Sequence, residues 1–242
     1  DAHIKDMDEA GIDAAVLTCN VGMDNLDMDV CRLINDRMKE AEEKYPGRFF
    51  SLAHAPAIGP DFADELKRCR DELGFQGTVM VSEPQGLGLD APELEEYYRT
   101  ASDLGFYVFV HPLLTSLSYS QLDNDYDLQR SIGREFSLVT ATVRLINGGV
   151  LDRFPGLQLV IGEYEVSWVP YWLFRLEQLD AEFGPEYNMP RLKRAPQEYL
   201  AQIYFGVVDD PNVRHVEGIV APDRLLWGSD FPHTRNTFPN SH

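Results

Sequence analysis

The sequence contains little of what a disulfide-stabilised, secreted or membrane-spanning protein needs. Its 242 residues include three cysteines, Cys19, Cys31 and Cys69. An odd number at irregular spacing argues against a disulfide framework and fits a reducing compartment, so we expect a cytoplasmic protein. The cysteines form no Cys-x-x-Cys pair, which argues against a zinc site built from thiolates. No apolar run approaches the roughly 20 residues of a membrane-spanning helix, and the polar N-terminal residues do not resemble a signal peptide.

Positive charge is also scarce. The chain has 21 lysines and arginines against 40 aspartates and glutamates, which gives a formal net charge of −19. Such a surface repels nucleic-acid phosphates and anionic membranes, so neither is an expected partner. The simplest interpretation of the acidity is a well-solvated surface, and the partner we expect is a small-molecule substrate. A homodimer is compatible with the sequence, but no residue pattern requires one.

Apolar strands alternate with amphipathic helices along the chain, which predicts a parallel sheet. No glycine-rich G-x-G-x-x-G turn follows the first strand, so a barrel is favoured over an open, doubly wound sheet. No break in composition marks a boundary, and we expect one domain over residues 1–242. Residues 113–134 break this alternation of strands and helices, and we expect them to form a polar loop excursion. The expected strands are 13–19, 48–54, 76–81, 106–111, 157–162, 201–207 and 224–228, and the expected helices 28–44, 61–73, 92–104, 136–150, 169–183 and 211–220.

Two polar residues stand where strands end, which is the edge at which parallel barrels carry out their chemistry. His111 ends a strongly apolar strand, and Pro112 favours an extended conformation for it. Asp230 follows the last strand, after Gly228 and Ser229. Imidazole and carboxylate are ligands for zinc, manganese and iron, and a carboxylate can accept a proton from metal-bound water. A strand-capping histidine and a helix-capping aspartate are the structural alternatives, and the residues alone leave both open.

Four further residues are candidates for the same edge. Glu163 and Glu165 directly follow a buried strand and are candidates for acid–base catalysis or ligation, or for an acidic helix start favoured by the helix dipole. His54 ends the second strand, where it is a candidate for substrate contact or for a structural role. His233 lies three residues beyond Asp230 and is expected near the site without binding a metal.

The remaining polar residues carry weaker signals. His3 has no supporting context and is interpreted as a surface residue. Arg134 and Arg144 lie around the helix that follows the excursion. An arginine there can hold a substrate carboxylate, although salt-bridged structure is the simpler interpretation.

The chain resembles the amidohydrolase-related barrels of the aminocarboxymuconate semialdehyde decarboxylase type. The order and spacing of several short segments, rather than any one of them, carry the resemblance through most of the chain. These segments are MDEAGID at 7–13, GFQG at 74–77, LGFYVFVHP at 104–112, GVLDRFPG at 149–156, WVPY at 168–171 and LWGSDFPH at 226–233.

The resemblance implies a (β/α)8 TIM barrel that holds one divalent metal ion, zinc foremost and manganese as the alternative. It implies that His111 is the metal ligand of the fifth barrel strand and Asp230 that of the eighth. Members of the family cleave bonds in small carboxylated or phenolic substrates, with the metal activating water or acting as a Lewis acid.

Two departures from the family pattern matter. The family begins with a strand that carries a His-x-His or Glu-x-His pair, and this sequence has none, because Asp1 to His3 lies too close to the helix before the first visible strand. We therefore expect the first strand and the C-terminal closing helix to be missing from this sequence. At the sixth strand, where many relatives place a catalytic histidine followed by glycines, Glu163 takes the approximate place of that histidine.

The leading hypothesis is a metal-dependent hydrolase or decarboxylase, that is, a carbon–carbon lyase, acting on a small carboxylated or aromatic substrate. It assigns catalysis to Asp230 and Glu163, metal binding to His111 and Asp230, and substrate contact to His54, Glu165 and His233. The alternative is a non-catalytic barrel that has lost its metal site and binds a ligand or partner. A third reading, an open α/β binding protein, requires a different strand order.

Overall fold

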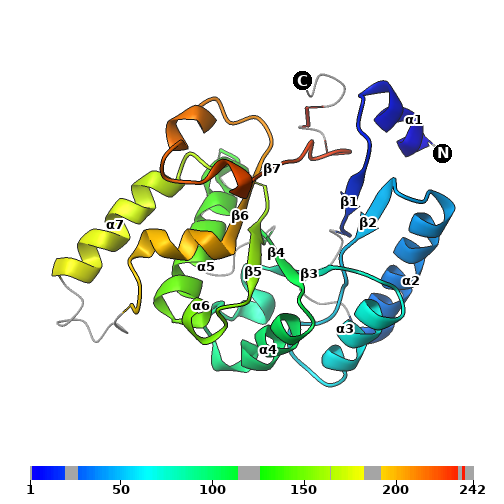
Figure 1. Cartoon of the computed structure of the whole chain (residues 1–242), viewed down its shortest axis with the longest axis horizontal. Helices are drawn as coiled ribbons and strands as arrows, with labels where there is room; N and C mark the ends of the chain where they lie inside the picture. Colours follow the sequence, from blue (N-terminus) through cyan, green and yellow to red (C-terminus); the bar gives the residue numbers. More distant parts are fainter. Residues whose placement is uncertain are drawn as a thin grey trace.

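The fold is seen in a computed structural model, which describes residues 2–19, 27–113, 126–163, 165–182, 192–233 and 236–237. Strands and helices alternate, and the strand pairs among these residues are all parallel (Figure 1). The strands are β1 Ala15–Leu17, β2 Phe49–Ser51, β3 Gly77–Val81, β4 Tyr107–His111, β5 Gln158–Ile161, β6 Ile203–Val207 and β7 Leu225–Trp227.

The strands follow one another in sequence order within two sheets. β1 pairs with β2, and the other sheet runs β3-β4-β5-β6-β7. An isolated parallel bridge joins the sheets, because the Ala53 amide donates to the Gly77 carbonyl at 2.8 Å and Val79 donates to the Ala53 carbonyl at 3.1 Å. Sequential parallel order without reversal belongs to a barrel, so the expected barrel is confirmed and the open-sheet reading is wrong.

Helices cover the outer side of these strands (Figure 1). The predicted helix over 28–44 is confirmed to the residue, and Asp27 caps it by accepting the Val30 amide at 2.9 Å. The helices are α1 Ala2–Glu9, α2 Met28–Lys44, α3 Phe62–Asp71, α4 Glu95–Asp103, α5 Arg134–Asn147, α6 Val150–Arg153 and α7 Val169–Glu182.

Three predictions differ from the structure. The segment 211–220 contains only a 3-10 turn, Val213–Val216, instead of a helix. The start of the predicted helix 92–104 is a 3-10 turn with Pro92 in its first positions, because proline lacks the amide but fits a first turn. The later part of the excursion is helical, with a π-helix over Gln129–Gly133 that leads into α5, whereas residues 114–125 lie outside the described residues.

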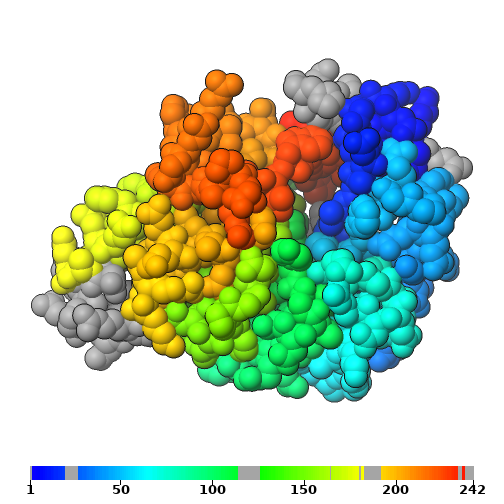
Figure 2. All heavy atoms as spheres, viewed as in Figure 1, coloured from blue at the N-terminus to red at the C-terminus, as the bar shows by residue number. Residues whose placement is uncertain are grey.

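The core lies between the larger sheet and its helices. Strand β3 is buried along its whole length, and Leu159 of β5 has no exposed surface. The inner face of the strands is different, since Val16 is 64% exposed and Trp227 51% exposed. In the described residues, β1 and β7 each pair on one side only. The interior is therefore open between these two strands, where Figure 2 shows the surface hollowed.

Candidate active site

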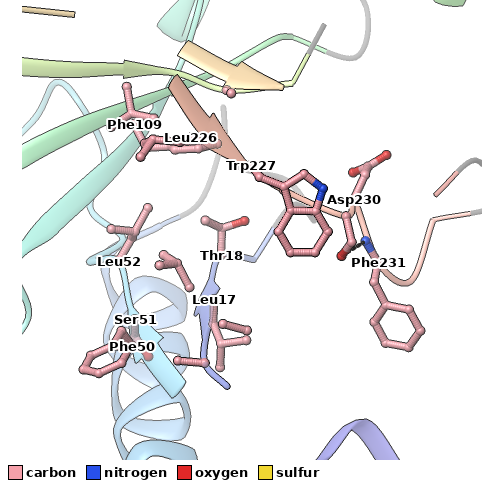
Figure 3. A pocket seen from close by; sticks show the side chains of 18 of the residues that line it. Leu17, Thr18, Phe50, Ser51, Leu52, Phe109, Leu226, Trp227, Asp230 and Phe231 are labelled. Carbon is pink, nitrogen blue, oxygen red and sulfur yellow. Dashed lines mark hydrogen bonds between the residues drawn. The ribbon is translucent and has the colours of Figure 1, made fainter. Parts of the chain in front are cut away.

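A cavity of about 1070 Å³ occupies the inside of the curved strands. Its apolar walls come from β1 and β2 on one side and from β6 and β7 on the other. Figure 3 shows Leu17 and Leu52 on one wall and Leu226 and Trp227 opposite. At the carboxyl ends of the strands the lining becomes polar, with Cys19, Glu163, Asp230 and His233. An apolar cavity with a few convergent polar groups at this end of a parallel barrel is the arrangement of an active site.

His111 is the most constrained of the predicted site residues. Its side chain is buried, and Nδ1 lies 2.7 Å from the Pro112 carbonyl oxygen, so this nitrogen carries the proton and donates it. The other ring nitrogen, Nε2, lies 2.8 Å from Glu163 Oε1. That approach lacks the direction of a hydrogen bond, and among the described residues Nε2 has no hydrogen-bond partner. In its neutral form, this imidazole therefore carries its proton on Nδ1 and leaves the Nε2 lone pair free, which is the form in which histidine binds a metal ion.

Backbone contacts from a neighbouring strand hold His111 in place. The amide of Ser82, directly after β3, donates to the His111 carbonyl at 2.9 Å, and the Ser82 hydroxyl accepts the Leu113 amide at 3.0 Å. Ser137 of α5 completes this buried contact through its own hydroxyl. These contacts fix the backbone at the strand exit, while the contact of Nδ1 with the Pro112 carbonyl restrains the ring.

Glu163 reaches His111 because of an unusual backbone conformation. Gly162 directly follows β5 and lines the cavity, and a Cβ atom there would lie 2.0 Å from the Phe109 ring, so a larger residue would have to displace that ring. The next residue of a regular strand would face outward, but Glu163 has φ of 59° and turns inward instead. Burial raises the pKa of Glu163, but the neighbouring His111 lowers it, and the net direction is downward.

Asp230 has a similar left-handed backbone, with φ of 59°, after β7. Its Oδ1 lies 2.7 Å from His233 Nδ1. Burial raises the pKa of Asp230, the hydrogen bond from His233 opposes this rise, and the Glu163 carboxylate adds to it. His111 also contributes to the electrostatics of Asp230, so strand ends from β4, β5 and β7 converge on one place. His233 orients Asp230, as expected for a residue beside the site.

His54 is held by backbone groups instead of facing the cavity. Its Nδ1 donates to the Leu52 carbonyl at 3.0 Å, and its Nε2 accepts the Cys19 amide at 3.1 Å. Burial lowers the pKa of this imidazole, which keeps it neutral. Asn35 completes the arrangement by accepting the His54 amide at 2.8 Å. The geometry supports the structural alternative, and the predicted substrate contact has no support in it.

Glu165 is also engaged with backbone. Its carboxylate accepts the amide of Val208 at 3.0 Å and that of Asp209 at 3.1 Å, beyond the end of β6. Glu165 therefore joins two neighbouring strand-end loops, and its predicted contact with substrate stays a prediction.

Two residues near the site were assigned elsewhere by the sequence. His3, interpreted from the sequence as a surface residue, is partly exposed but lines the cavity, with its ring centroid 5.1 Å from that of Phe231. Arg134, at the start of α5, contributes positive charge at Glu163. Arg144 forms the expected salt bridge, to Asp90 at 2.8 Å. Nothing in the spacing of His3 pointed to the cavity, because its contact partners lie far along the chain.

The described residues supply only part of a metal site. Among them no group of three or more histidines, cysteines, aspartates or glutamates is arranged to hold an ion. The unused Nε2 of His111 and the converging Asp230 carboxylate nevertheless suit a divalent cation in donor type. Both donors lie at strand ends, as the sequence predicted, whereas their role as ligands remains a proposal.

Among the described residues, no helix is long and apolar enough to span a membrane.

Comparison with known proteins gives relatives along nearly the whole chain. Gamma-resorcylate decarboxylase of Rhizobium sp. (strain MTP-10005) is 26% identical over 254 residues, covering 96% of this chain and 76% of that protein. The 2-amino-3-carboxymuconate-6-semialdehyde decarboxylase of Dictyostelium discoideum is 25% identical over 212 residues, covering 85% of this chain and 57% of that protein. The second relative confirms the type of family that the sequence motifs suggested.

Solved structures point to the same type of family. The crystal structure of 5-carboxyvanillate decarboxylase from Novosphingobium aromaticivorans, complexed with manganese and 4-hydroxy-3-methoxy-5-nitrobenzoic acid, superposes with a TM-score of 0.86 at 27% identity. The match covers 96% of this chain and 70% of that chain. Manganese in that neighbour supports a divalent metal, while the preference for zinc is not established. The Amidohydrolase family model matches residues 11–240, and the chain therefore belongs to the amidohydrolase family.

Proposed function

We propose that this protein is a metal-dependent decarboxylase acting on a small aromatic carboxylate. The observation that carries the proposal is the buried Nε2 of His111, which faces Glu163 and lies with Asp230 at the carboxyl ends of the strands. The decarboxylases among its relatives and structural neighbours support the reaction type, and their names support an aromatic acid as substrate. No observation favours a barrel that has lost its metal site.

His111 and Asp230 would hold the metal ion in this proposal. Their donor types suit manganese and zinc alike, so the identity of the ion is left to measurement. A bound divalent cation supplies a Lewis acid that neutralises charge on substrate oxygens. Further ligands would come from the substrate, from water or from groups outside the described residues, since the described ones form no larger cluster.

The remaining site residues bind and orient the substrate and carry a proton. The apolar walls around Leu226 and Trp227 offer an aromatic ring a surface to pack against. In a decarboxylation the carbon–carbon bond to the carboxylate breaks, carbon dioxide leaves, and a proton takes its place on the ring carbon. Glu163 lines the cavity, and we assign to it the relay of this proton from water to the ring carbon.

Metal analysis and activity of purified variants test the proposal, using the protein expressed from its complete gene. We expect His111→Ala and Asp230→Ala to lose bound metal. We expect Glu163→Gln to keep the metal and to lose decarboxylation of hydroxylated benzoates by a factor on the order of 100 or more. His215→Ala is the control, because this histidine lies on a 3-10 turn outside the cavity lining. Metal-free wild-type protein that still decarboxylates, or Glu163→Gln with full activity, would refute the assignment.

A further inference from the structure

Two carboxylates bind reciprocally across the loops that follow β5 and β6. Glu165, on the β5 loop, accepts amides of the β6 loop, from Val208 at 3.0 Å and Asp209 at 3.1 Å. Asp210, on the β6 loop, accepts amides of the β5 loop, from Val166 at 3.0 Å and Ser167 at 2.8 Å. Each loop therefore supplies the acceptor for the other, and we call this arrangement the loop clasp.

Asp210 is the more deeply engaged of the two carboxylates. It is only 7% exposed, and its Oδ1 accepts the Ser167 hydroxyl at 2.5 Å and the Asn212 amide at 2.8 Å. Burial raises the pKa of Asp210, but the hydrogen bonds that it accepts lower it, and the net direction is downward. These four contacts of the carboxylate are all with N–H or O–H donors, so the ionised form fits without a mismatch.

The loop clasp begins at the end of a strained stretch of backbone. Glu163 and Glu165 have φ of 59° and 64°, a left-handed conformation that is unfavourable for non-glycine residues. Such a conformation persists only where surrounding contacts fix it. The indole of Trp168 adds one further contact by donating to the Glu165 carbonyl at 3.1 Å. On the other side, a Cβ at Gly206 would lie 3.2 Å from the Glu163 amide nitrogen, so the two loops approach closely here.

We propose that Asp210 and Glu165 are positioning residues, which hold the strained turn so that the Glu163 carboxylate points at His111. Neither carboxylate needs to touch the substrate for this role. Only the expected effect on kcat rests on the proposed catalytic role of Glu163. The structural consequence, the contact of Glu163 with His111, stands independently of the reaction.

The variant Asp210→Asn separates this role from ordinary loop stability. Each oxygen of the Asp210 carboxylate accepts two donors. An asparagine must place its NH2 group at one of these two positions, where it faces donors instead of acceptors. Glu165→Gln is milder, because its amide oxygen can still accept the Val208 and Asp209 amides at the Oε2 position. Asp209→Asn is the matched control: it is adjacent to Asp210 and chemically identical, but its side chain is exposed.

Crystal structures of the three variants provide the direct readout, which needs no activity. We expect Glu163 to leave His111 in Asp210→Asn and to stay near the 2.8 Å separation in Asp209→Asn. Glu163 unmoved in Asp210→Asn would overturn the proposal, whatever reaction the protein catalyses. If Asp210→Asn does not fold, the same comparison is made with Ser167→Ala, which removes one hydroxyl donor from Asp210 and leaves its amide donors in place.

Kinetics on folded, metal-replete protein supply the second readout. We expect kcat to fall about tenfold to a hundredfold in Asp210→Asn, less in Glu165→Gln and not at all in Asp209→Asn. The solvent deuterium isotope effect on kcat should rise in the same order, because proton transfer through a misplaced Glu163 becomes slower. A displaced Glu163 with unchanged kcat would instead refute the catalytic role of Glu163 and leave the loop clasp intact, so the two failures are distinguishable.

Discussion

The two sides of the barrel differ in how their strands are completed. On the side of β4 to β6, each strand pairs with a neighbour on both sides and its residues pack under helices. On the side of β1 and β7, one edge of each strand is unpaired among the described residues, and inward apolar side chains are exposed. His111 and Glu163 belong to the first side and Asp230 to the second. Among the described residues, the candidate site therefore combines side chains from fully paired strands with one carboxylate, Asp230, from a strand that is paired on one edge.

The largest contrast between the sides should appear in their response to cavity-forming substitutions. Leu159 on β5 is fully buried, and Leu159→Ala should lower the free energy of unfolding by about 2 to 5 kcal/mol. Leu226 on β7 is 41% exposed, and Leu226→Ala should cost less than about 1 kcal/mol. Urea unfolding of both variants measures the two values. Equal losses would show that the open side contributes as much to stability as the closed one.

Hydrogen exchange should distinguish the same two sides without any substitution. Amides of β4 and β5, which lie inside the larger sheet, should exchange only through openings close to global unfolding. Amides of β1 should exchange much faster, because this three-residue strand has one paired edge. Mass spectrometry or NMR measures both rates in one sample. Slow exchange in β1 would mean that its second edge is protected.

A smaller effect should appear as pH dependence of stability. Glu65 is buried; burial raises its pKa, but Arg68 at 2.8 Å and Asn35 at 2.7 Å lower it below its ordinary value. A carboxylate whose pKa is lower in the folded state stabilises the fold above its unfolded pKa, and this contribution is lost as the pH falls through the folded value. The free energy of unfolding, measured from pH 7 to pH 3, should therefore fall less steeply in Glu65→Gln than in the wild type. The exposed Glu43→Gln is the control, and a curve that is identical for all three proteins would contradict the expectation.

The smallest expected effect concerns His233, on the open side. His233→Ala removes the 2.7 Å contact with Asp230 but no group that we assign to metal or proton transfer. Activity should fall about tenfold, at the lower end of the roughly 10- to 100-fold cost of losing a group that orients a metal ligand. Steady-state kinetics on the variant measures this. A loss as large as that of Asp230→Ala would place His233 within the reacting centre.

The fold could be read from the sequence because its signals are local. Apolar runs bounded by glycine and proline marked the strands, and the helix over 28–44 carried its own cap. The exits at His111 and Asp230 could also be read, since each follows directly from a strand. Both features depend on residues a few positions apart, which a single sequence displays.

The directions in which the side chains point could not be predicted from the sequence in the same way. Glu163 turns inward through a left-handed φ, which no neighbouring residue type announces. His54 was a candidate for substrate contact, but its ring binds the Cys19 backbone, 35 positions away. Glu165 binds the amides of Val208 and Asp209 for a similar reason, across 43 and 44 positions. Contacts set by tertiary structure decide between a structural and a chemical role, and sequence periodicity carries no information about them.

The metal content of the protein expressed from its complete gene tests the central claim most directly. Equilibrium dialysis against manganese, and separately against zinc, followed by elemental analysis, would compare the wild type with His111→Ala and with the control His215→Ala. The account predicts about one tightly held ion per chain in the wild type and the control, and none in His111→Ala. Equal metal content in His111→Ala and the wild type, or no bound ion in any of them, would contradict it.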